Sequence, residues 1–382
     1  MSNPPRAFNS YPSSPSTQQR WYKALTIDVL LAVLNRTILH PWVAWILVLS
    51  LRAQVTPYTD LSFMIATGYA VFLTLIAVGR TINHRVAYGL PRHVDLTEEV
   101  VIVTGGASGL GQVIARMYSM RGASVAVLDI KPREEISDDE VSGGAEYYCC
   151  DVGDRAMVEA TVDQIEKELG TPTILINCAA ASINGLPLLS LPASSFQKTL
   201  STNLLSVLNT TQVCLPRMLS PSSSPSDNED TEARGGGTIV NISSVTGALC
   251  PAGLSDYSAS KSALTALHRT LEAEIRASGT NDHIKLLLVE TGQIATPLFR
   301  AVRTPNAFFA PVLEPVQVAR AIVDAVDAGE GGTVRLPFFA SLVHWYAVLP
   351  AGVQRVARWL SGIDGAVAEA GFEAEGRGVK EG

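Results

Sequence analysis

The sequence predicts an α/β protein in which a doubly wound parallel sheet follows N-terminal membrane-anchoring helices. Three observations predict it. After residue 93, short β-branched runs alternate with helical stretches, which is typical of βαβ units with a buried parallel sheet. One of these runs leads directly into a glycine-rich turn and then a helix. Upstream of them all, residues 61–79 are apolar and carry no charge, and their number is close to that needed to span a bilayer.

Composition narrows the class of protein. Hydrophobic residues make up 47% of the 382 residues, and much of this excess falls between residues 24 and 79, which favours a membrane element over an enlarged core. A formal charge of -7 without a basic stripe argues against a nucleic-acid partner. The five cysteines lack the Cys/His spacing of a zinc site, so we expect no metal, and their odd number predicts reduced thiols in a cytosol-facing domain.

The chain divides into four parts. Residues 1–20 are polar and predict a disordered tail, 21–93 a membrane anchor, 94–340 the α/β domain and 341–382 an amphipathic C-terminal tail. The anchor fits either a two-pass hairpin or one span with an interfacial helix. Arg80, Arg85 and Arg92 follow the apolar stretch, which places its flanks in the cytosol.

Within the α/β domain we expect six buried strands, at 100–103, 124–128, 174–176, 238–242, 284–289 and 333–336. Residues 220–237 are rich in Ser, Pro and Gly and predict a disordered surface insert. The C-terminal tail mixes large apolar side chains with Arg355 and Arg358. A lid helix and a membrane-surface helix both fit this pattern.

The glycine-rich turn predicts a dinucleotide site. Thr104-Gly105-Gly106-Ala107-Ser108-Gly109-Leu110-Gly111 lies between strand and helix, where small residues admit a pyrophosphate and the helix N-terminus favours its charge. Asp129 ends the next strand, where a carboxylate accepts hydrogen bonds from the adenosine ribose and repels a 2′-phosphate. The sequence therefore favours NAD over NADP, and Lys131 with Arg133 keeps NADP as the alternative.

A second cluster predicts acid–base chemistry. Tyr257 and Lys261 are four residues apart, so on a helix they share one face. A phenol has a pKa near 10, and a neighbouring ammonium together with an oxidised nicotinamide would lower it toward the working range. Ser244 lies after the strand at 238–242, where its hydroxyl can hold an alcohol or carbonyl oxygen.

The Thr-Gly-x-x-x-Gly-x-Gly turn, the Ser-x12-Tyr spacing of Ser244 and Tyr257, and Tyr-x-x-x-Lys resemble the short-chain dehydrogenase/reductase family over roughly residues 97–340. The resemblance implies a Rossmann sheet, an adenine contact by Asp151 and Val152, a strand-end role for Asn177 and a carboxamide contact by Thr296. It also implies that Asn203 joins a water-linked proton relay to Lys261, which would bind the nicotinamide ribose. The sequence departs from the family at Cys178 and Ala180, which replace Asn and Gly. The expected catalytic residues are Ser244, Tyr257, Lys261 and Asn203, and the expected cofactor residues are Gly105, Ser108, Gly109, Leu110, Gly111, Asp129, Asp151, Val152, Asn177, Tyr257, Lys261 and Thr296.

The substrate end is less specific. Residues 298–311, where the family places a mobile substrate loop, contain three phenylalanines. With the anchor, this resembles the membrane- and lipid-droplet-associated branch that includes retinol and 17β-hydroxysteroid dehydrogenases. It implies an NAD(P)-dependent alcohol dehydrogenase or carbonyl reductase for a retinoid, steroid or fatty alcohol, at the endoplasmic reticulum or a lipid droplet, in a homodimer. The alternative is a catalytically silent cofactor-binding membrane protein. Glu290 is interpreted as a solvent- or cofactor-edge residue, with a catalytic acid as the alternative.

Overall fold

The computed structural model describes residues 26–136, 144–220, 236–300, 302, 304 and 306–367. The expected tail 1–20, most of the insert 220–237 and the end of the C-terminal tail lie outside the described residues.

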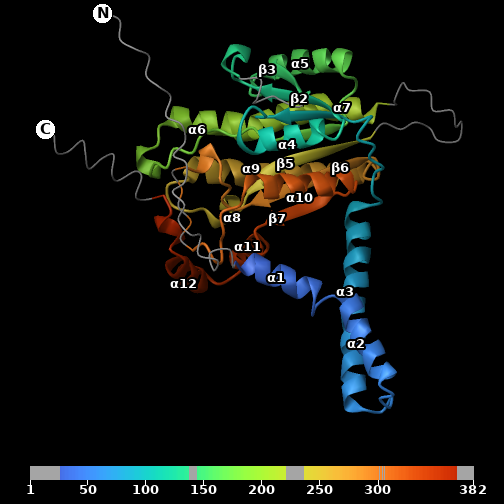
Figure 1. The fold of residues 1–382 in the computed structure, drawn as a ribbon. Helices are drawn as coiled ribbons and strands as arrows, with labels where there is room; N and C mark the ends of the chain where they lie inside the picture. The colour runs from blue at the N-terminus through green and yellow to red at the C-terminus, as the bar shows by residue number, and fades with distance from the viewer. Residues whose placement is uncertain are drawn as a thin grey trace, which may run out of the picture.

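A seven-stranded parallel sheet forms the centre of the α/β domain (Figure 1). Its strands are β1 (Val100–Thr104), β2 (Ser124–Asp129), β3 (Glu146–Cys149), β4 (Ile174–Asn177), β5 (Gly237–Ser244), β6 (Ile284–Thr291) and β7 (Gly332–Leu336), in the order β3-β2-β1-β4-β5-β6-β7. The predicted doubly wound parallel sheet is confirmed, and all six expected runs are strands. The sequence missed β3, because this edge strand has only one buried residue among its four and lacks the apolar run of a central strand.

Helices cover both faces of the sheet. Buried side chains of α4 (Gly109–Ser119) and α10 (Pro315–Asp327) pack in one core cluster with β1 and β6. Those of α5 (Arg155–Glu168), α7 (Ser206–Leu219) and the C-terminal part of α9 (Ser255–Ala277) pack in the other. The remaining helices of this domain are α6 (Ala193–Leu200), α8 (Thr246–Leu249), α11 (Phe339–Ala347) and α12 (Ala351–Ser361).

The strand order fixes where a ligand can bind. The chain crosses from the edge strand β3 back to β4 on the other side of β1. The connections leaving β1 and β4 therefore diverge, and a crevice opens at the carboxyl ends of these strands. The glycine-rich turn follows β1, and Cys178 follows β4.

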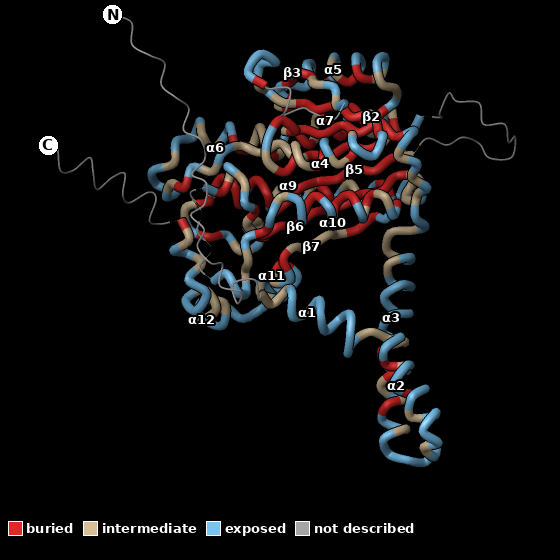
Figure 2. The backbone as a smooth tube through the Cα atoms, viewed as in Figure 1, coloured by how far each residue is buried: buried red, intermediate tan, exposed pale blue. Residues whose placement is uncertain are grey.

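Three helices precede the sheet: α1 (Ile27–Arg36), α2 (Pro41–Ala53) and α3 (Leu61–Tyr88). Figure 2 shows α2 and α3 projecting together from the domain, largely exposed. Their contact is a short stripe of small and apolar residues, Ala44, Val48, Ala66, Ala70 and Leu73. The helix α3 is long and apolar enough to cross a membrane, and only 17% of its most apolar window is buried, unlike a core helix of a soluble protein. The helices α1 and α2 reach that length only as a pair, bent by 46°.

The inner end of α3 is fixed to the α/β domain. The Arg276 guanidinium donates to the carbonyl of Ala87 at 3.3 Å, and the Lys285 ammonium donates to that of Tyr88 at 3.1 Å. Both carbonyls belong to the last turn of α3, where carbonyl groups have no N–H partner within the helix. The buried Lys285 thus couples the projecting helix to β6.

Candidate active site

The glycine-rich turn is held tightly against the end of β4. Gly105 has a φ of +65°, a conformation that a side chain would strain, and its N–H donates to the carbonyl of Leu128 at 2.7 Å. A Cβ at Gly105 would lie 2.7 Å from Cα of Ala179, and one at Gly111 would lie 2.5 Å from the carbonyl oxygen of Gly105. Only glycine fits at both positions, so the turn keeps its backbone close to the N-terminus of α4.

The hydroxyl of Thr104 joins the two strand ends that flank the crevice. Its Oγ1 accepts from the N–H groups of Cys178 at 3.0 Å and Ala179 at 3.2 Å. The segment that departs from the family pattern therefore still has an ordered backbone, tied to β1. Cys178 is half-buried, and the loss of hydration raises the pKa of its thiol to about 11, so it stays protonated at neutral pH.

The side-chain amide of Asn177 is held by neighbours inside the protein. Its Nδ2 donates to Oδ1 of Asn241 at 2.9 Å, and its Oδ1 accepts from the Thr210 hydroxyl at 2.8 Å. Asn241 in turn lies 3.0 Å from Nδ1 of the buried His268. Because these partners occupy the Asn177 amide, its side chain belongs to a buried polar chain between β4, β5 and the helices α7 and α9.

The adenosine end of the crevice contains the expected carboxylate. Oδ2 of Asp129 accepts from the N–H of Ala107 at 3.1 Å, which puts the charge beside the glycine-rich turn. Asp151 is exposed and accepts from the N–H of Gly153 at 2.9 Å, and Val152 beside it is buried. These two residues lie past β3, so they flank the same edge of the sheet as Asp129.

At the other end of the turn, Thr296 faces the start of α4. A Cβ at Gly109 would lie 3.5 Å from Cγ2 of Thr296, and Leu110, the next residue, is buried. Ser108 immediately precedes α4 in an extended conformation. These features fit a dinucleotide. The turn carries only small side chains, the N-terminus of the 11-residue helix α4 points into it, and the Asp129 carboxylate lies at the adenosine end.

Ser244 and Tyr257 come together over the carboxyl end of the sheet. Ser244 is the last residue of β5, and Tyr257 lies in the first turn of α9. Ser244 lies close enough to Tyr257 to lower the pKa of its phenol, while its own hydroxyl donates to the carbonyl of Thr291 at 3.2 Å. The phenol ring is 3% exposed and packs edge-on against Phe299, with 6.2 Å between the ring centroids.

The electrostatics of Tyr257 differ from expectation. Burial is the largest influence and raises the pKa of the phenol above its usual value, more than Ser244 lowers it. Lys261 does not lower it in the protein alone, because its Nζ donates to the carbonyl of Ile242 at 2.7 Å and lies 5.6 Å from the Tyr257 ring centroid. Burial therefore dominates the pKa of the phenol among the protein's own groups, and its lowering by Lys261 together with a nicotinamide stays a prediction.

Lys261 itself is strongly perturbed. It is 3% exposed, and burial lowers the pKa of its ammonium to about 8, because charge is costly away from water. Among the described residues with a resolved shift, it is the amine whose pKa lies nearest to neutrality. A group poised in this range suits proton transfer.

Asn203 lies next to this cluster in a π-helical turn, Ser201–Leu205, between α6 and α7. Its Oδ1 accepts from the N–H of Ala181 at 2.8 Å, and its Nδ2 donates to the hydroxyl of Ser260 at 2.9 Å. Such turns often mark functional sites. The Asn203 side chain thus contacts Ser260, the residue before Lys261. It makes no direct hydrogen bond to the Lys261 amine, which donates to Ile242.

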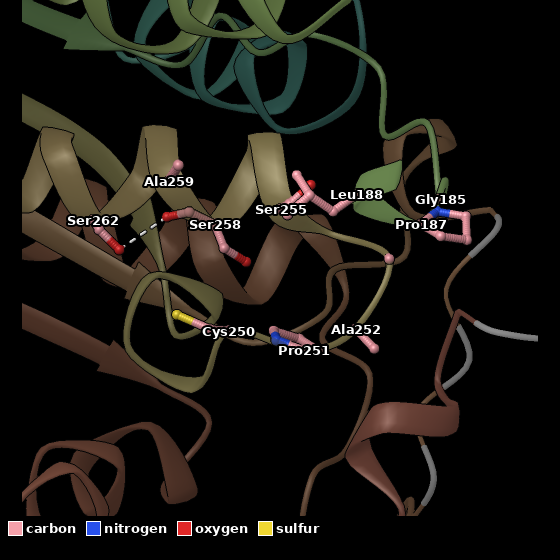
Figure 3. A pocket seen from close by; sticks show the side chains of 11 residues that line it. Gly185, Pro187, Leu188, Cys250, Pro251, Ala252, Ser255, Ser258, Ala259 and Ser262 are labelled. Carbon is pink, nitrogen blue, oxygen red and sulfur yellow. Dashed lines mark hydrogen bonds between the residues drawn. The ribbon is translucent and has the colours of Figure 1, made fainter. Parts of the chain in front are cut away.

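An apolar cavity of about 650 Å³ adjoins the cluster. Ser244 and Phe299 contribute to its wall, as do Val302 and Phe309 of the expected substrate loop. A separate hollow of about 660 Å³ lies at another face of α9, where Ser262 donates to the carbonyl of Ser258 (Figure 3). That hollow is not lined by Ser244, whereas the first cavity is, together with Phe299, which packs on the Tyr257 ring, so the first cavity is the candidate substrate site.

Comparisons with known proteins agree with this geometry. Residues 99–307 match the family model described as short chain dehydrogenase. The chain belongs to the short-chain dehydrogenase/reductase family. It is 30% identical to human short-chain dehydrogenase/reductase 3, over 74% of this chain and 90% of that protein. An uncharacterized oxidoreductase of Saccharomyces cerevisiae is 30% identical over 69% of this chain and 82% of its own length. Retinol dehydrogenase 10-A of Xenopus laevis is 27% identical over 67% of this chain and 78% of its own length.

The predicted family is thereby confirmed, and the chain is an oxidoreductase of this family with an NAD(P) site. The C-terminal tail, for which the sequence left a lid helix and a membrane-surface helix open, lies over the cavity of this short-chain dehydrogenase, and its contacts there were not predicted. The helices α11 and α12 contribute Leu342, Tyr346 and Leu360 to the cavity wall. The Arg358 guanidinium donates to the carbonyls of Leu249 at 2.6 Å and Cys250 at 3.0 Å, which fastens α12 to the α8 segment. No spacing in the sequence signals these contacts, because the partners are more than 100 residues apart.

Glu290 is neither at a solvent edge nor at the cofactor crevice. It is 4% exposed, and its Oε2 lies 2.8 Å from Nε of Arg335 and 3.1 Å from Nε2 of His344. The register that pairs Glu290 with Arg335 on β7 puts the two charges side by side. Because a buried carboxylate with a charged partner is satisfied, Glu290 connects β6, β7 and α11.

Proposed function

We propose that this dehydrogenase interconverts a lipophilic alcohol and its carbonyl, of the retinoid, steroid or fatty alcohol class, with Tyr257 as acid and base. The observation that carries the proposal is that Ser244, which acts on the Tyr257 phenol, and Phe299, which packs on its ring, both line an apolar cavity of about 650 Å³. Few polar groups in an apolar wall fix the orientation of a lipophilic ligand. The printed names of relatives that are retinol dehydrogenases support the same substrate class.

The residues divide the work as follows. A bound nicotinamide would accept or supply the hydride, held by the glycine-rich turn, Asp129 and Thr296. Ser244 holds the substrate oxygen through its hydroxyl. Tyr257 takes the proton of the alcohol during oxidation and returns it during reduction. Its burial opposes ionisation, so this transfer needs positive charge near the ring, which an oxidised nicotinamide would add to that of Lys261, 5.6 Å from the ring centroid.

For the cofactor we propose NAD over NADP. The Asp129 carboxylate next to the glycine-rich turn accepts from ribose hydroxyls and repels a 2′-phosphate. Lys131 and Arg133, after the end of β2, are the cations that would support NADP instead. Arg133 lies 5.9 Å from the ring centroid of Tyr147, which directs it toward β3.

We further propose that α3 anchors the enzyme in the endoplasmic reticulum or lipid-droplet membrane, with the α/β domain in the cytosol. The support is the length, composition and exposure of α3. We also propose a homodimer through the faces of α7 and α9.

Turnover of a panel of lipophilic alcohols, with NAD and with NADP, tests the proposal. Replacing Tyr257 with Phe should lower kcat by roughly 10²–10⁴-fold, the usual contribution of a positioned acid–base group, while dinucleotide affinity stays the same. Near-normal turnover by this variant would overturn the assignment. A wild-type chain that binds a dinucleotide but converts no alcohol or carbonyl would favour the catalytically silent alternative.

A further inference from the structure

Three helices from opposite ends of the chain expose an unusual number of large apolar side chains. On α11 and α12, Trp345 and Trp359 are 72% and 79% exposed. Beside them Val348, Val353, Val356 and Leu360 are also exposed, as are Val29 and Val33 on α1. Single apolar residues are common on soluble proteins, but a contiguous set marks an interaction surface. We call the set on α1, α11 and α12 the apolar face.

The three helices are tied together where the cavity closes. The N–H of Ile27 donates to the carbonyl of Phe308 at 3.2 Å, and the Asp28 carboxylate accepts from the N–H of Phe338. The start of α1 is thereby fixed to the substrate loop and to the start of α11. Since α11 and α12 also supply Leu342 and Leu360 to the cavity wall, the apolar face is the outer surface of the lid over the substrate.

The apolar face lies on the side of the domain from which the anchor leaves. In Figure 1, α1, α11 and α12 all lie at the end of the domain toward α2, level with the inner half of α3. That half of α3 carries the exposed Arg80 and Arg85, directly after its charge-free stretch. The exposed Arg355 on α12 adds a cation to the apolar face. Cations at this level match the phosphates of an anionic leaflet.

We propose that the apolar face docks on the phospholipid bilayer that α3 enters, and that the substrate cavity fills from that bilayer through the lid. Amphipathic helices with Trp and Leu on one face and Arg beside it bury that face among headgroups and acyl chains. The docking rests on the proposed anchoring by α3 but not on the proposed reaction, whereas the entry route for a lipophilic alcohol rests on both.

Quenching by brominated lipids tests the docking. The full chain is reconstituted into phosphatidylcholine–phosphatidylserine vesicles, with or without bromine on the upper acyl carbons. The emission of Trp345 and Trp359 is obtained by subtracting that of the double variant Trp345→Phe and Trp359→Phe from that of the wild type. We expect this difference to fall in brominated vesicles.

Two controls bracket the measurement. Trp42, 75% exposed on α2, is subtracted in the same way through Trp42→Phe and should be quenched with the anchor. An indole added by Met157→Trp on α5, at the far side of the sheet (Figure 1), should not be. A difference emission for Trp345 and Trp359 that bromine leaves unchanged overturns the proposal, whether water, a second copy or another protein covers the face.

The entry route has its own test. The double variant Val356→Glu and Trp359→Glu places charge on the apolar face at residues that do not line the cavity, and Met157→Glu is the matched control. Turnover of a bilayer-partitioned alcohol in vesicles should fall several-fold in the double variant, while turnover of a short water-soluble alcohol stays unchanged. Equal loss for both alcohols contradicts entry from the bilayer. If the wild type converts neither alcohol, the proposed function fails, and the quenching result still decides the docking.

Discussion

The two ends of the active-site crevice are built in different ways. The dinucleotide end is formed by turns that directly follow β1, β2 and β4, so a few contiguous residues determine it. The substrate end is enclosed by a loop after β6 and by α11 and α12, helices that contact α8 nearly a hundred residues earlier. Ser244 and Tyr257 lie where the two ends meet.

This difference teaches which changes the enzyme tolerates. At the dinucleotide end, the backbone of the glycine-rich turn lies so close to that of Ala179 that there is no space for a Cβ at Gly105. A single added methyl group must therefore displace the main chain. At the substrate end, side chains and helices meet through apolar contacts and one arginine, which can shift without breaking the sheet. The following changes test that contrast, beginning with the largest expected effect.

Gly105→Ala should be the most damaging change. The new Cβ meets Cα of Ala179 at 2.7 Å, and the φ of +65° is unfavourable for alanine. The two penalties together amount to roughly 2–5 kcal/mol, and the turn that would hold the pyrophosphate must move. Thermal unfolding and dinucleotide affinity measure the effect. Gly122→Ala is the matched control, because it has a φ of +90° and nothing within 4 Å. Equal losses in the two variants would show that the close approach to Ala179 is unimportant.

Asp129→Ala should weaken NADH binding by about 10–100-fold, since hydrogen bonds to a charged group contribute about 1.5–3 kcal/mol. Binding of NADPH should weaken less, because the variant removes repulsion of the 2′-phosphate. Asp129→Asn separates two effects, since its amide oxygen still accepts from the N–H of Ala107 but carries no charge. Titration of both cofactors against the three proteins measures this. An unchanged preference would contradict the proposed choice of NAD.

The same contrast explains what the sequence could predict. Six of the seven strands, the glycine-rich turn and Asp129 follow from local patterns, because residues close in sequence or at strand ends determine them, and the family resemblance supplied the pairing of Ser244 with Tyr257. The hydrogen bond between the side chains of Asn177 and Asn241 could not be predicted. It depends on the register of β4 and β5, which places the two residues opposite each other. Nor could the raised pKa of Tyr257, because a helical spacing gives the direction of a side chain but not its burial. The contacts that put α11 and α12 over the cavity are tertiary, so the sequence pattern left a lid helix and a membrane-surface helix open.

Arg358→Ala probes the substrate end. It removes the hydrogen bonds to the carbonyls of Leu249 and Cys250 and the ion pair with Asp364, so α12 should open more often. We expect kcat/KM for a lipophilic alcohol to fall about 10-fold, equivalent to about 1.4 kcal/mol, with dinucleotide affinity unchanged. Hydrogen exchange of α12 amides should accelerate in parallel. Arg358→Lys keeps the charge but not the planar guanidinium, so its kcat/KM should lie between those of the wild type and Arg358→Ala. A loss of dinucleotide affinity would show that the two ends are coupled.

Lys261 lies where the two ends of the crevice meet, and its titration has the smallest expected effect. Burial lowers the pKa of its ammonium from the usual 10.5 to about 8, so between these values the unfolded chain binds more protons than the folded one. Stability must then rise with pH across this window. The gain from pH 8 to pH 9 is about 1 kcal/mol, or about 2–4 °C in Tm for a domain of this size. The Tm of the wild type minus that of Lys261→Met, measured without dinucleotide, isolates this contribution from the other titrating groups. The phenol of Tyr257, whose pKa is raised by burial, acts oppositely only above pH 10. A difference that stays flat between pH 8 and 9 would mean that the Lys261 amine is solvated, and the meeting point of the two ends would then be open to water.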